Sequence, residues 1–595
     1  MTTTVADALL QRLREWEVDR MFGYPGDGIN GIHAAMQRAD GPRFVQARHE
    51  ELAAFMASGH ARFTGQVGVC LATSGPGAIH LLNGLYDAKL DRQPVLAIVG
   101  AQATTARGGS YQQEVDLTNL YKDVAGAFLV EVTSPQQLPL AVDRAMRTAL
   151  TRRTVTAIVV PIDVQEQEYV APSHAFKMVP SSRGVVEPEI SPPDDALDAA
   201  AELVNAGERV AVLVGQGARG AAAEVRELAE LTGAGVAKAL LGKDVLPDDL
   251  PWVTGPIGLL GSKPSWTLMD ECDTFLCIGS NMPYTQFLPG LDQARAIDID
   301  IDPHNIGLRY PFEFNLVGDA ALTLRRLLPR IERKVDRSWR DKLEGEVAQW
   351  WDLVERRAMV DADPLNPQRV YWELSSRLPD DVIITADSGS GTNWFARDLR
   401  LREGMRASLS GTLATMGPAM PHAVGAKFAH PGRPVIATVG DGAMQMNGMN
   451  VLITIAKYWR EWEDPRLVVL VLDNQDLNQV TWEMRAMGGF PKLEETQEVP
   501  RVDFVAFAES LGLAGHHLDD PDAVGPTWDR ALSADRPTVV QARVDPDVPP
   551  IPPHVESDQV ESLVKALLGG DRDAAGIIST GARERVQDFL VRMRS

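Results

Sequence analysis

One stretch of the chain combines two buried-strand patterns with the residue types that bind phosphate and metal ions. It runs from Pro434 to Asn474, with Gly440-Asp441-Gly442 where the first apolar run ends and Asp473-Asn474 where the second ends. Glycines let a backbone approach a diphosphate closely, and N–H groups at a helix N-terminus bind its oxygens. We therefore predict a diphosphate-binding turn at which Gly442 and Ala443 present their N–H groups.

The charge of a diphosphate also favours Mg²⁺ or Ca²⁺, which take oxygen ligands. Because parallel neighbouring strands end at the same edge of a sheet, we expect the Asp441 carboxylate and the Asn474 amide to reach one ion. A carbonyl near Asp476 is the expected third ligand. An ordinary βα turn is the alternative interpretation of the GDG tripeptide alone, and the asparagine at the matching strand end favours the metal site.

These residues resemble the cofactor signature of the thiamine-diphosphate-dependent enzymes that decarboxylate 2-oxo acids. In that family GDG, a helix and a strand ending in Asn hold the diphosphate and its Mg²⁺ ion. The gap between the two elements is about six residues longer here, and the excess falls in 458–465. We expect this insertion to loop out without moving either ligand, because connections between a helix and a strand tolerate extra residues.

A second segment that carries chemistry, Arg48-His49-Glu50-Glu51, precedes an apolar helical pattern. Thiamine diphosphate acts as a carbanion and an electron sink, so the protein must help to deprotonate its thiazolium carbon. By resemblance Glu50 is the activating glutamate, which bonds the aminopyrimidine nitrogen and drives that ring toward its imino tautomer. First-turn acids favoured by the helix dipole are the alternative interpretation of Glu50 and Glu51.

Three shorter segments match the family in chain order. Met416, in Thr415-Met416-Gly417, is expected by resemblance to wedge between the two cofactor rings, and a core methionine is the alternative interpretation. Gly389 and Ser390 lie in a small-residue turn suited to phosphate oxygens. Gln113 resembles the loop glutamine that lines the active site of these enzymes.

Alternating strand and helix patterns predict an α/β protein with three doubly wound parallel-sheet domains. We expect these domains at 1–180, 190–335 and 362–550, followed by a C-terminal tail at 551–595. By resemblance the first domain binds the pyrimidine, the central domain is of the FAD type and the third binds the diphosphate. The resemblance also implies a homo-oligomer, a dimer of dimers, in which each site joins two subunits.

Glycines and polar residues follow the strand-like runs of the central domain. They resemble the FAD-binding positions of pyruvate oxidases and acetolactate synthases, and the candidates are Gly215, Arg219, Asn281 and Asp300. Plain turns are the alternative explanation of strand-end glycines. Several such segments in one domain favour FAD.

The residues after Asn474 bear on the reaction type. Val480 and, three residues later, Glu483 match quinone-linked pyruvate oxidases, whereas acetolactate synthases place a tryptophan where Glu483 stands. Asn478 replaces the usual glycine of the family, which indicates a different pocket.

The resemblance therefore implies oxidative decarboxylation of pyruvate with thiamine diphosphate, Mg²⁺ and FAD, and quinone or oxygen as the electron acceptor. Carboligation of 2-oxo acids, as in acetolactate synthases, is the nearest alternative. Non-oxidative decarboxylation or C–C bond cleavage is the next alternative. A non-catalytic binding or regulatory protein with a cofactor-type fold is the alternative from a different class.

Composition narrows the compartment and the partners. A formal net charge of −23 with no evident basic domain argues against nucleic acid as a partner. The three cysteines form no metal-binding or disulfide pattern, which favours a reducing compartment. The N-terminal segment lacks a signal-peptide pattern, and no apolar run is long enough to cross a bilayer. We expect a cytoplasmic protein.

The end of the chain, Arg583–Ser595, has apolar residues at helical spacing with arginines opposite. By resemblance to quinone-linked pyruvate oxidases, such a helix contacts the inner face of the membrane peripherally. Packing against its own protein or a partner subunit is the equal alternative.

Overall fold

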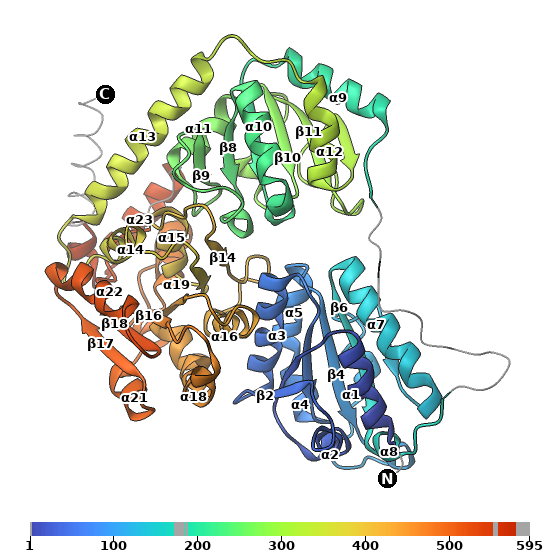
Figure 1. Ribbon diagram of the computed structural model, residues 1–595. Coiled ribbons are helices and arrows are strands. Elements are labelled where there is room, and N and C mark those ends of the chain that lie inside the picture. Colours follow the sequence, from blue (N-terminus) through green and yellow to red (C-terminus); the bar gives the residue numbers. More distant parts are fainter. Residues whose placement is uncertain (1–2, 172–184, 186–188, 551–556, 579–595) are drawn as a thin grey trace.

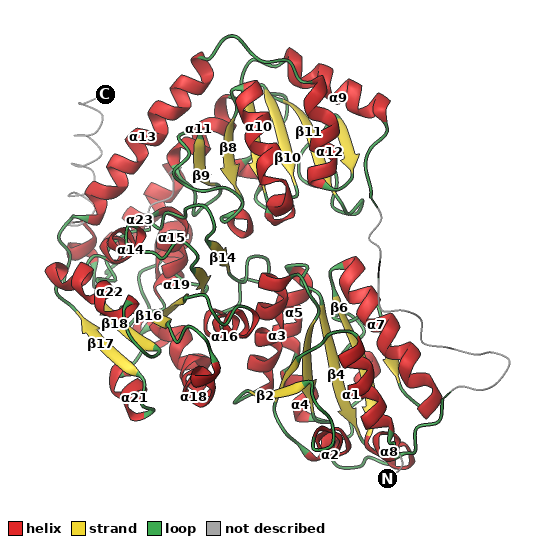
Figure 2. Cartoon of the chain, in the orientation of Figure 1, coloured by secondary structure: helices red, strands yellow, loops and turns green. Residues whose placement is uncertain are grey.

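The computed structural model describes residues 3–171, 185, 189–550 and 557–578 of the 595-residue chain. Within them the chain folds into three α/β units, each built on a six-stranded sheet whose neighbouring strands run parallel. Helices lie on the faces of the sheets (Figures 1 and 2). The predicted fold class, three doubly wound parallel sheets, is confirmed.

The first sheet has the strand order β2-β1-β3-β4-β6-β5. Its strands are β1 Arg20–Gly23, β2 Arg43–Gln46, β3 Gly68–Ala72, β4 Val95–Ala101, β5 Leu129–Glu131 and β6 Val155–Pro161. Its helices are α1 Val5–Glu15, α2 Asn30–Met36, α3 Glu50–Thr64, α4 Pro76–His80, α5 Leu82–Leu90, α6 Leu117–Leu120, α7 Leu138–Arg152 and α8 Ile162–Glu166.

The central sheet has the order β12-β11-β10-β7-β8-β9. Its strands are β7 Val210–Val214, β8 Gly235–Lys238, β9 Val253–Pro256, β10 Thr274–Ile278, β11 Arg295–Asp300 and β12 Phe314–Val317. Its helices are α9 Asp194–Ala206, α10 Ala222–Thr232, α11 Lys263–Glu271 and α12 Ala320–Leu327, and the long helix α13 Ser338–Ala358 leads to the third unit.

The third sheet has the order β14-β13-β15-β16-β18-β17. Its strands are β13 Ile383–Ala386, β14 Arg406–Ser408, β15 Val435–Gly440, β16 Leu467–Asp473, β17 Ala514–Leu518 and β18 Thr538–Arg543. Its helices are α14 Pro367–Ser375, α15 Gly391–Arg397, α16 Ala419–Ala429, α17 Asp441–Ala443, α18 Met449–Tyr458, α19 Asn478–Glu483, α20 Glu494–Gln497, α21 Phe504–Ser510 and α22 Val524–Leu532, and α23 Ser557–Leu568 follows.

The first and third sheets share one strand order. In each, the chain passes from the first strand to the second at one edge and then returns to place the third strand on the other side of the first. Open α/β sheets bind ligands at the carboxyl ends of strands where the order reverses in this way. That point lies between β1 and β3 in the first unit and between β13 and β15 in the third.

The first and third units share a core at the contact of α3 with α16, which lie side by side in Figure 1. Gly59 and Gly425 allow the two helices to approach closely. A Cβ atom at Gly59 would lie 2.6 Å from the Cα atom of His422, and one at Gly425 would lie 2.4 Å from the carbonyl oxygen of Met56. Because a real Cβ cannot lie so near to backbone atoms, both positions require glycine.

A buried charged network lies beside this contact. The Arg62 guanidinium, on α3, donates 2.8 Å hydrogen bonds to Asp87 and Asp91 of the first unit and a 3.0 Å bond to the carbonyl oxygen of Leu409 in the third. Asp91 also accepts from the N–H groups of Gly411 and Thr412 at 2.9 and 2.8 Å. The segment that leads to Met416 is thus fixed to the first unit.

The insertion at 458–465 does not loop out into solvent, so that expectation was wrong. Trp462 is buried, with its ring 6.0 Å from that of Phe428, and the Tyr458 hydroxyl accepts a 2.8 Å bond from the N–H of Gln46 in β2. Glu461 forms a 3.0 Å ion pair with Arg43 of the same strand. Aromatic side chains bury themselves where apolar surface is within reach, so the extra residues became an interdomain contact.

Two expectations concern membranes. Among the described helices, none combines the length and the apolar character that crossing a bilayer requires. The predicted amphipathic helix at Arg583–Ser595 lies outside the described residues.

We expect Gly59→Ala to lower the midpoint of thermal unfolding by several degrees, because overpacking at a closed helix contact costs about 1–3 kcal/mol. Calorimetry of the cofactor-free protein measures this. Gly345→Ala is the matched control, since Gly345 is exposed on α13 and a Cβ there meets no atom within 4 Å. Alanine favours a helix over glycine, so the control should keep or raise the midpoint. Equal midpoints for the two variants would contradict the close contact.

Candidate functional site

The predicted phosphate-binding turn lies at the switch point of the third sheet. β15 ends at Gly440 and α17 begins at Asp441, so Gly442 and Ala443 lie in the first turn of a helix. A Cβ atom added at Gly440 would meet no atom within 4 Å, and the same holds at Gly389 after the neighbouring β13. Both glycines therefore border open space at the carboxyl edge of the sheet, which suits a diphosphate.

Gly389 and Ser390 form the turn between β13 and α15, and Gly389 has a φ of +130°, which favours glycine. Just before this turn the buried Asp387 accepts hydrogen bonds from the N–H groups of Gly417 at 2.8 Å and Ala419 at 3.1 Å. Burial raises the pKa of Asp387 to about 7. The turn and the Met416 segment are thus held as one unit.

Asp441 is 3% exposed and lies where the ends of β15 and β16 meet. Its two carboxylate oxygens accept hydrogen bonds from the N–H groups of Gly442 at 2.8 Å and Gln475 at 2.6 Å. Burial, with a further contribution from the nearby Asp473, raises the pKa of Asp441 to about 7. The structure therefore brings Asp441 and the loop that starts at Asn474 together.

These donors fit a divalent cation, because a buried carboxylate with a raised pKa gains a charge partner when a metal binds. The Asp476 carboxylate is engaged elsewhere, by the Thr481 hydroxyl at 2.9 Å, the Asn478 amide at 3.0 Å and the Lys492 ammonium at 3.1 Å. Only the main-chain carbonyl of Asp476 suits the predicted role, and that assignment stays a prediction.

Met416 reaches the phosphate-binding turn. A Cβ atom built at Gly442 would lie 3.5 Å from the terminal methyl group of Met416. The side chain is half-buried and packs at the edge of the core that the first and third units share. This position above the GDG turn agrees with the predicted contact to the cofactor rings.

In the first unit, Glu50 is the first residue of α3 and is 6% exposed. Its Oε2 atom lies 3.0 Å from Nδ1 of His80, which ends α4, and the His80 ring stacks on His49 with the ring centroids 4.3 Å apart. A Cβ atom at Gly77 would lie 3.0 Å from Glu50 Oε1, so the strand-end turn after β3 borders the carboxylate directly.

Gln113 lies on the other side of that turn. A Cβ atom at Gly75 would be 2.7 Å from Cβ of Gln113, and the Gln113 amide oxygen accepts a 3.0 Å hydrogen bond from the Ser74 hydroxyl. The structure thus places Glu50 and Gln113 around one turn. Sequence reasoning missed His80, which lies three residues after Gly77 at the end of α4 and belongs to no pattern that the sequence analysis used.

Asn83 joins the two halves of the candidate site within one chain. Its side-chain amide donates hydrogen bonds to Glu51 Oε1 at 2.6 Å and to the Thr415 hydroxyl at 3.1 Å. Glu51, the neighbour of Glu50, is therefore connected through Asn83 to Thr415, the neighbour of Met416. The predicted sharing of each site between two subunits stays a prediction.

Glu483 ends α19 and is exposed. Its carboxylate accepts a 3.0 Å hydrogen bond from the Gln479 amide, whose oxygen accepts a 2.9 Å bond from Asn393 on α15. Glu483 is therefore linked through Gln479 to α15, the helix that follows the Gly389-Ser390 turn. Two residues later, the buried Arg485 binds Asp571 and Asp573 of the C-terminal segment at 2.8 Å.

The central sheet brings the predicted FAD-binding residues to one edge. Gly215 follows β7 and Asn281 follows β10, and the strand order reverses between these two strands. A Cβ atom at Gly215 would lie 2.2 Å from the carbonyl oxygen of Gly279, so contact between two turns already requires this glycine.

Arg219 and Asp300 lie at the same edge but differ in how they are engaged. Arg219 forms a 2.8 Å ion pair with the buried Asp244, which pairs in turn with Arg406 of the third unit at 3.0 Å. Asp300 ends β11, and burial raises its pKa. A carboxylate at the end of a strand next to the switch point suits the hydroxyl groups of a nucleotide, so this edge fits a dinucleotide in part.

Lys243 ties the central unit to α15. Its ammonium group is buried and donates to the carbonyl oxygens of Ala396 at 3.0 Å and Leu399 at 2.8 Å, at the C-terminal end of that helix. Burial lowers the pKa of Lys243 to about 8. The C-terminal end of α15, which follows the Gly389-Ser390 turn, is thus capped by a cation from the central unit.

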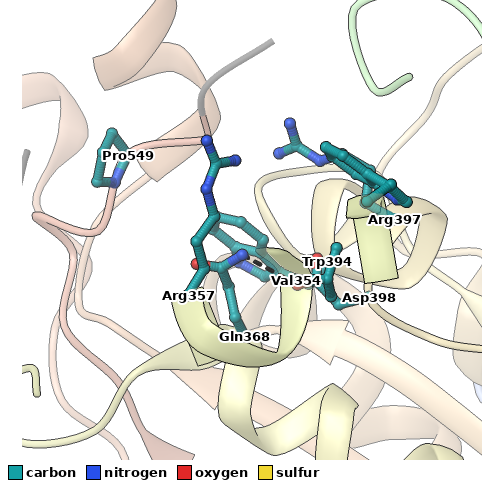
Figure 3. A pocket seen from close by; sticks show the side chains of 8 residues that line it. Val354, Arg357, Gln368, Trp394, Arg397, Asp398 and Pro549 are labelled. Atoms are coloured by element: carbon teal, nitrogen blue, oxygen red, sulfur yellow. Dashed lines mark hydrogen bonds between the residues drawn. The ribbon is translucent and has the colours of Figure 1, made fainter. Parts of the chain in front are cut away.

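A small cavity lies at that same far end of α15 (Figure 3). Gln368 donates a 2.9 Å bond to Asp398 at its floor, and burial raises the pKa of Asp398 to about 6. The cavity has room for roughly one water molecule. It is lined by Trp350, Val354, Arg357, Gln368, Trp394, Arg397, Asp398 and Pro549. A space of this size accommodates no 2-oxo acid. None of its lining residues belongs to the Gly389-Ser390 turn or to the Gly440–Ala443 turn.

Three family models match the chain in order. Residues 3–120 match the N-terminal TPP binding domain of thiamine pyrophosphate enzymes, 197–327 match the central domain, and 387–542 match the C-terminal TPP binding domain. Thiamine pyrophosphate is another name for thiamine diphosphate. The matched ranges contain the strands of the three sheets except β5, β6 and β13 and the last residue of β18.

The chain is 35% identical over 572 residues to a Bacillus subtilis (strain 168) protein named "Putative thiamine pyrophosphate-containing protein YdaP", covering 95% of this chain and 96% of the relative. It is 30% identical to the pyruvate oxidase of Lactiplantibacillus plantarum over 76% of this chain and 74% of the relative. It is also 30% identical to the acetolactate synthase isozyme 2 large subunit of Escherichia coli (strain K12), over 92% and 97%.

Both cofactor-binding units and the unit between them therefore match one family along most of the chain. The chain belongs to the thiamine pyrophosphate enzyme family and is a thiamine-diphosphate-dependent enzyme.

Proposed function

We propose that this enzyme catalyses the oxidative decarboxylation of pyruvate with thiamine diphosphate, Mg²⁺ and FAD, and passes the electrons to quinone or oxygen. The observation that carries the oxidative assignment is Glu483 on α19. Its carboxylate is linked through Gln479 and Asn393 to α15, the helix that follows the Gly389-Ser390 turn. A carboxylate that faces the substrate suits control of protonation and electron transfer better than the tryptophan that acetolactate synthases place there. Similarity to a pyruvate oxidase supports the same assignment.

Thiamine diphosphate, when bound, supplies the nucleophilic carbon and the electron sink for loss of CO₂. Asp441 and Asn474 hold the metal ion, and the N–H groups of Gly442 and Ala443 bind phosphate oxygens. The open turn at Gly389 and Ser390 receives the rest of the diphosphate. Met416 would contact the cofactor rings.

Glu50 holds the proton that activates the aminopyrimidine. His80 orients the Glu50 carboxylate through their 3.0 Å contact and, being exposed, connects it to solvent. A partly buried acid with one hydrogen-bond partner is suited to move a proton at a fixed atom. Gln113, across the same turn, lies in position to orient the substrate.

FAD is assigned to the switch point of the central sheet, with Gly215, Arg219, Asn281 and Asp300 along it. The functional unit is assigned as a cytoplasmic homo-oligomer, a dimer of dimers, in which the first unit of one subunit meets the third unit of another. Peripheral contact with the inner face of the membrane through the C-terminal tail is part of the same proposal. Nucleic acid has no role in it.

Carboligation of 2-oxo acids is the second candidate. Acetolactate synthases match more than nine-tenths of this chain at 30% identity or more, a longer span than the matched pyruvate oxidase. The two functions share every residue of the cofactor site and differ in what receives the electrons or the carbon fragment.

Anaerobic addition of pyruvate to the purified enzyme separates the two candidates. Oxidative chemistry bleaches the bound flavin, and an artificial quinone then restores its colour while one CO₂ forms per two electrons. Carboligation yields acetolactate with no net reduction of the acceptor, and that result would overturn the proposal. Bound flavin by itself decides nothing, because the bleaching is the readout.

We expect Glu50→Gln to lower the turnover number about a hundredfold or more while thiamine diphosphate still binds, because removal of a general acid–base group has this magnitude. Glu51→Gln is the matched control, since it removes a charge one residue away on the same helical turn. Steady-state rates and cofactor titration by tryptophan fluorescence give the two readouts. Equal rates for both variants would refute the assignment of Glu50.

The affinity for Mg²⁺ should rise with pH through about 7. Burial raises the pKa of Asp441 to about 7, so below this pH the metal-free carboxyl carries a proton that the ion must displace. Between pH 6 and pH 8 one displaced proton changes the apparent affinity roughly tenfold. Calorimetric titration in two buffers of different ionisation enthalpy measures the proton release, and a pH-independent affinity would contradict the prediction.

A further inference from the structure

Gln479 links Glu483 to α15, and the proposed function gives it no role of its own. It lies one turn before Glu483 on α19 and is half-buried. Its side-chain nitrogen donates a 3.0 Å hydrogen bond to Glu483 Oε1, and its oxygen accepts a 2.9 Å bond from the side-chain nitrogen of Asn393. Among the described residues, Glu483 has no other hydrogen-bond or ion-pair partner. The orientation of its carboxylate therefore depends on Gln479.

Asn393 fixes the direction of this chain of hydrogen bonds. It lies in the first turn of α15 and is 2% exposed. Its side-chain nitrogen also donates a 3.1 Å bond to the carbonyl oxygen of Ser390, so both of its donors are used. Because an ionised carboxylate only accepts hydrogen bonds, Gln479 must present its nitrogen to Glu483 and its oxygen to Asn393. The three side chains thus form one directed chain that starts at the Gly389-Ser390 turn.

The backbone of α19 is held by other residues. The Asn478 amide and the Trp482 indole nitrogen donate to the same carbonyl oxygen, that of Pro546, at 2.9 and 3.3 Å. Thr481 is fully buried on the same side of the helix. Because these contacts hold the helix without Gln479, we expect loss of Gln479 to free the Glu483 side chain and to leave the helix in place.

We propose that Gln479 is a positioning residue that holds the Glu483 carboxylate in one orientation relative to the Gly389-Ser390 turn, an inference that rests on the proposed oxidative function. A carboxylate that controls protonation and electron transfer must keep its distance from the reacting atoms, because a displacement of about 1 Å can cost about a hundredfold in rate. An exposed Gln–Glu pair on a helix is weak by itself. The buried Asn393 gives this pair a third partner, which is itself fixed by the turn.

Anaerobic stopped-flow reduction of the bound flavin by pyruvate tests the inference. The rate constant is measured for the wild type, Gln479→Leu, Glu483→Gln and the double variant, together with the affinity for thiamine diphosphate and the thermal midpoint. Gln11→Leu is the matched control, because Gln11 donates a 3.1 Å bond to Glu15, also four residues later, on α1 of the first unit.

We expect Gln479→Leu to lower the rate constant of flavin reduction about tenfold, because a hydrogen bond to a charged group has this magnitude. Its affinity for thiamine diphosphate and its thermal midpoint should stay at the wild-type values. Because Gln479 acts through Glu483, the double variant should be no slower than Glu483→Gln alone. Gln11→Leu should match the wild type throughout.

Three results would overturn the inference. An unchanged rate constant in Gln479→Leu leaves the residue without a positioning role, and losses that multiply in the double variant mean that it acts independently of Glu483. If Gln479→Leu melts lower than the wild type, Gln479→Glu keeps the side-chain shape without the donor, and a wild-type rate there has the same meaning. A wild type whose flavin is not reduced by pyruvate refutes the proposed function before any variant is compared, so the two failures are distinguishable.

Discussion

The close contact of α3 with α16 is the interaction on which the rest of the structure depends. Two glycines let the helices approach to backbone distance, and the buried Arg62 network locks the same surfaces together. A buried guanidinium is tolerated only when its donors are satisfied, and here two carboxylates and a carbonyl oxygen satisfy them. One consequence is that the segment leading to Met416 takes its position from the first unit, although it belongs to the third.

The cofactor-binding region carries its own electrostatic cost. Asp387 and Asp441 are both buried, and burial raises the pKa of each to about 7. Backbone N–H groups compensate part of this cost, which is how Asp387 organises two turns at once. Asp441 also accepts two backbone N–H groups, and a divalent cation would compensate the rest of its charge. The two acids differ in position, because Asp387 joins two turns whereas Asp441 lies beside open space at the strand ends.

The sequence allowed the fold class and the main groups of the site to be predicted because they depend on short-range patterns. Asp441 and Asn474 follow strand-like runs, and parallel topology alone makes those strand ends neighbours. Glu50 stands at the start of a clear helical pattern. His80 was missed, because its importance comes from a contact with Glu50 in a different helix. No local periodicity reports such contacts.

The prediction for the insertion at 458–465 failed for a related reason. Its place between a helix and a strand allowed it to loop out, but Trp462 and Tyr458 pack on Phe428, and the Tyr458 hydroxyl also accepts a hydrogen bond from β2 of the first unit. Whether extra residues leave the surface or settle on it depends on what lies opposite, which only the tertiary structure shows.

The capping of α15 by Lys243 has a mechanical consequence. This helix is seven residues long, about 10 Å, and rigid over that length. One end borders the Gly389-Ser390 turn, and the other accepts hydrogen bonds from Lys243 of the central unit. A molecule that shifted Lys243 would therefore act on one end of a short helix whose other end borders the Gly389-Ser390 turn. Where binding at one end changes the affinity at the other, thermodynamic reciprocity gives both changes the same factor.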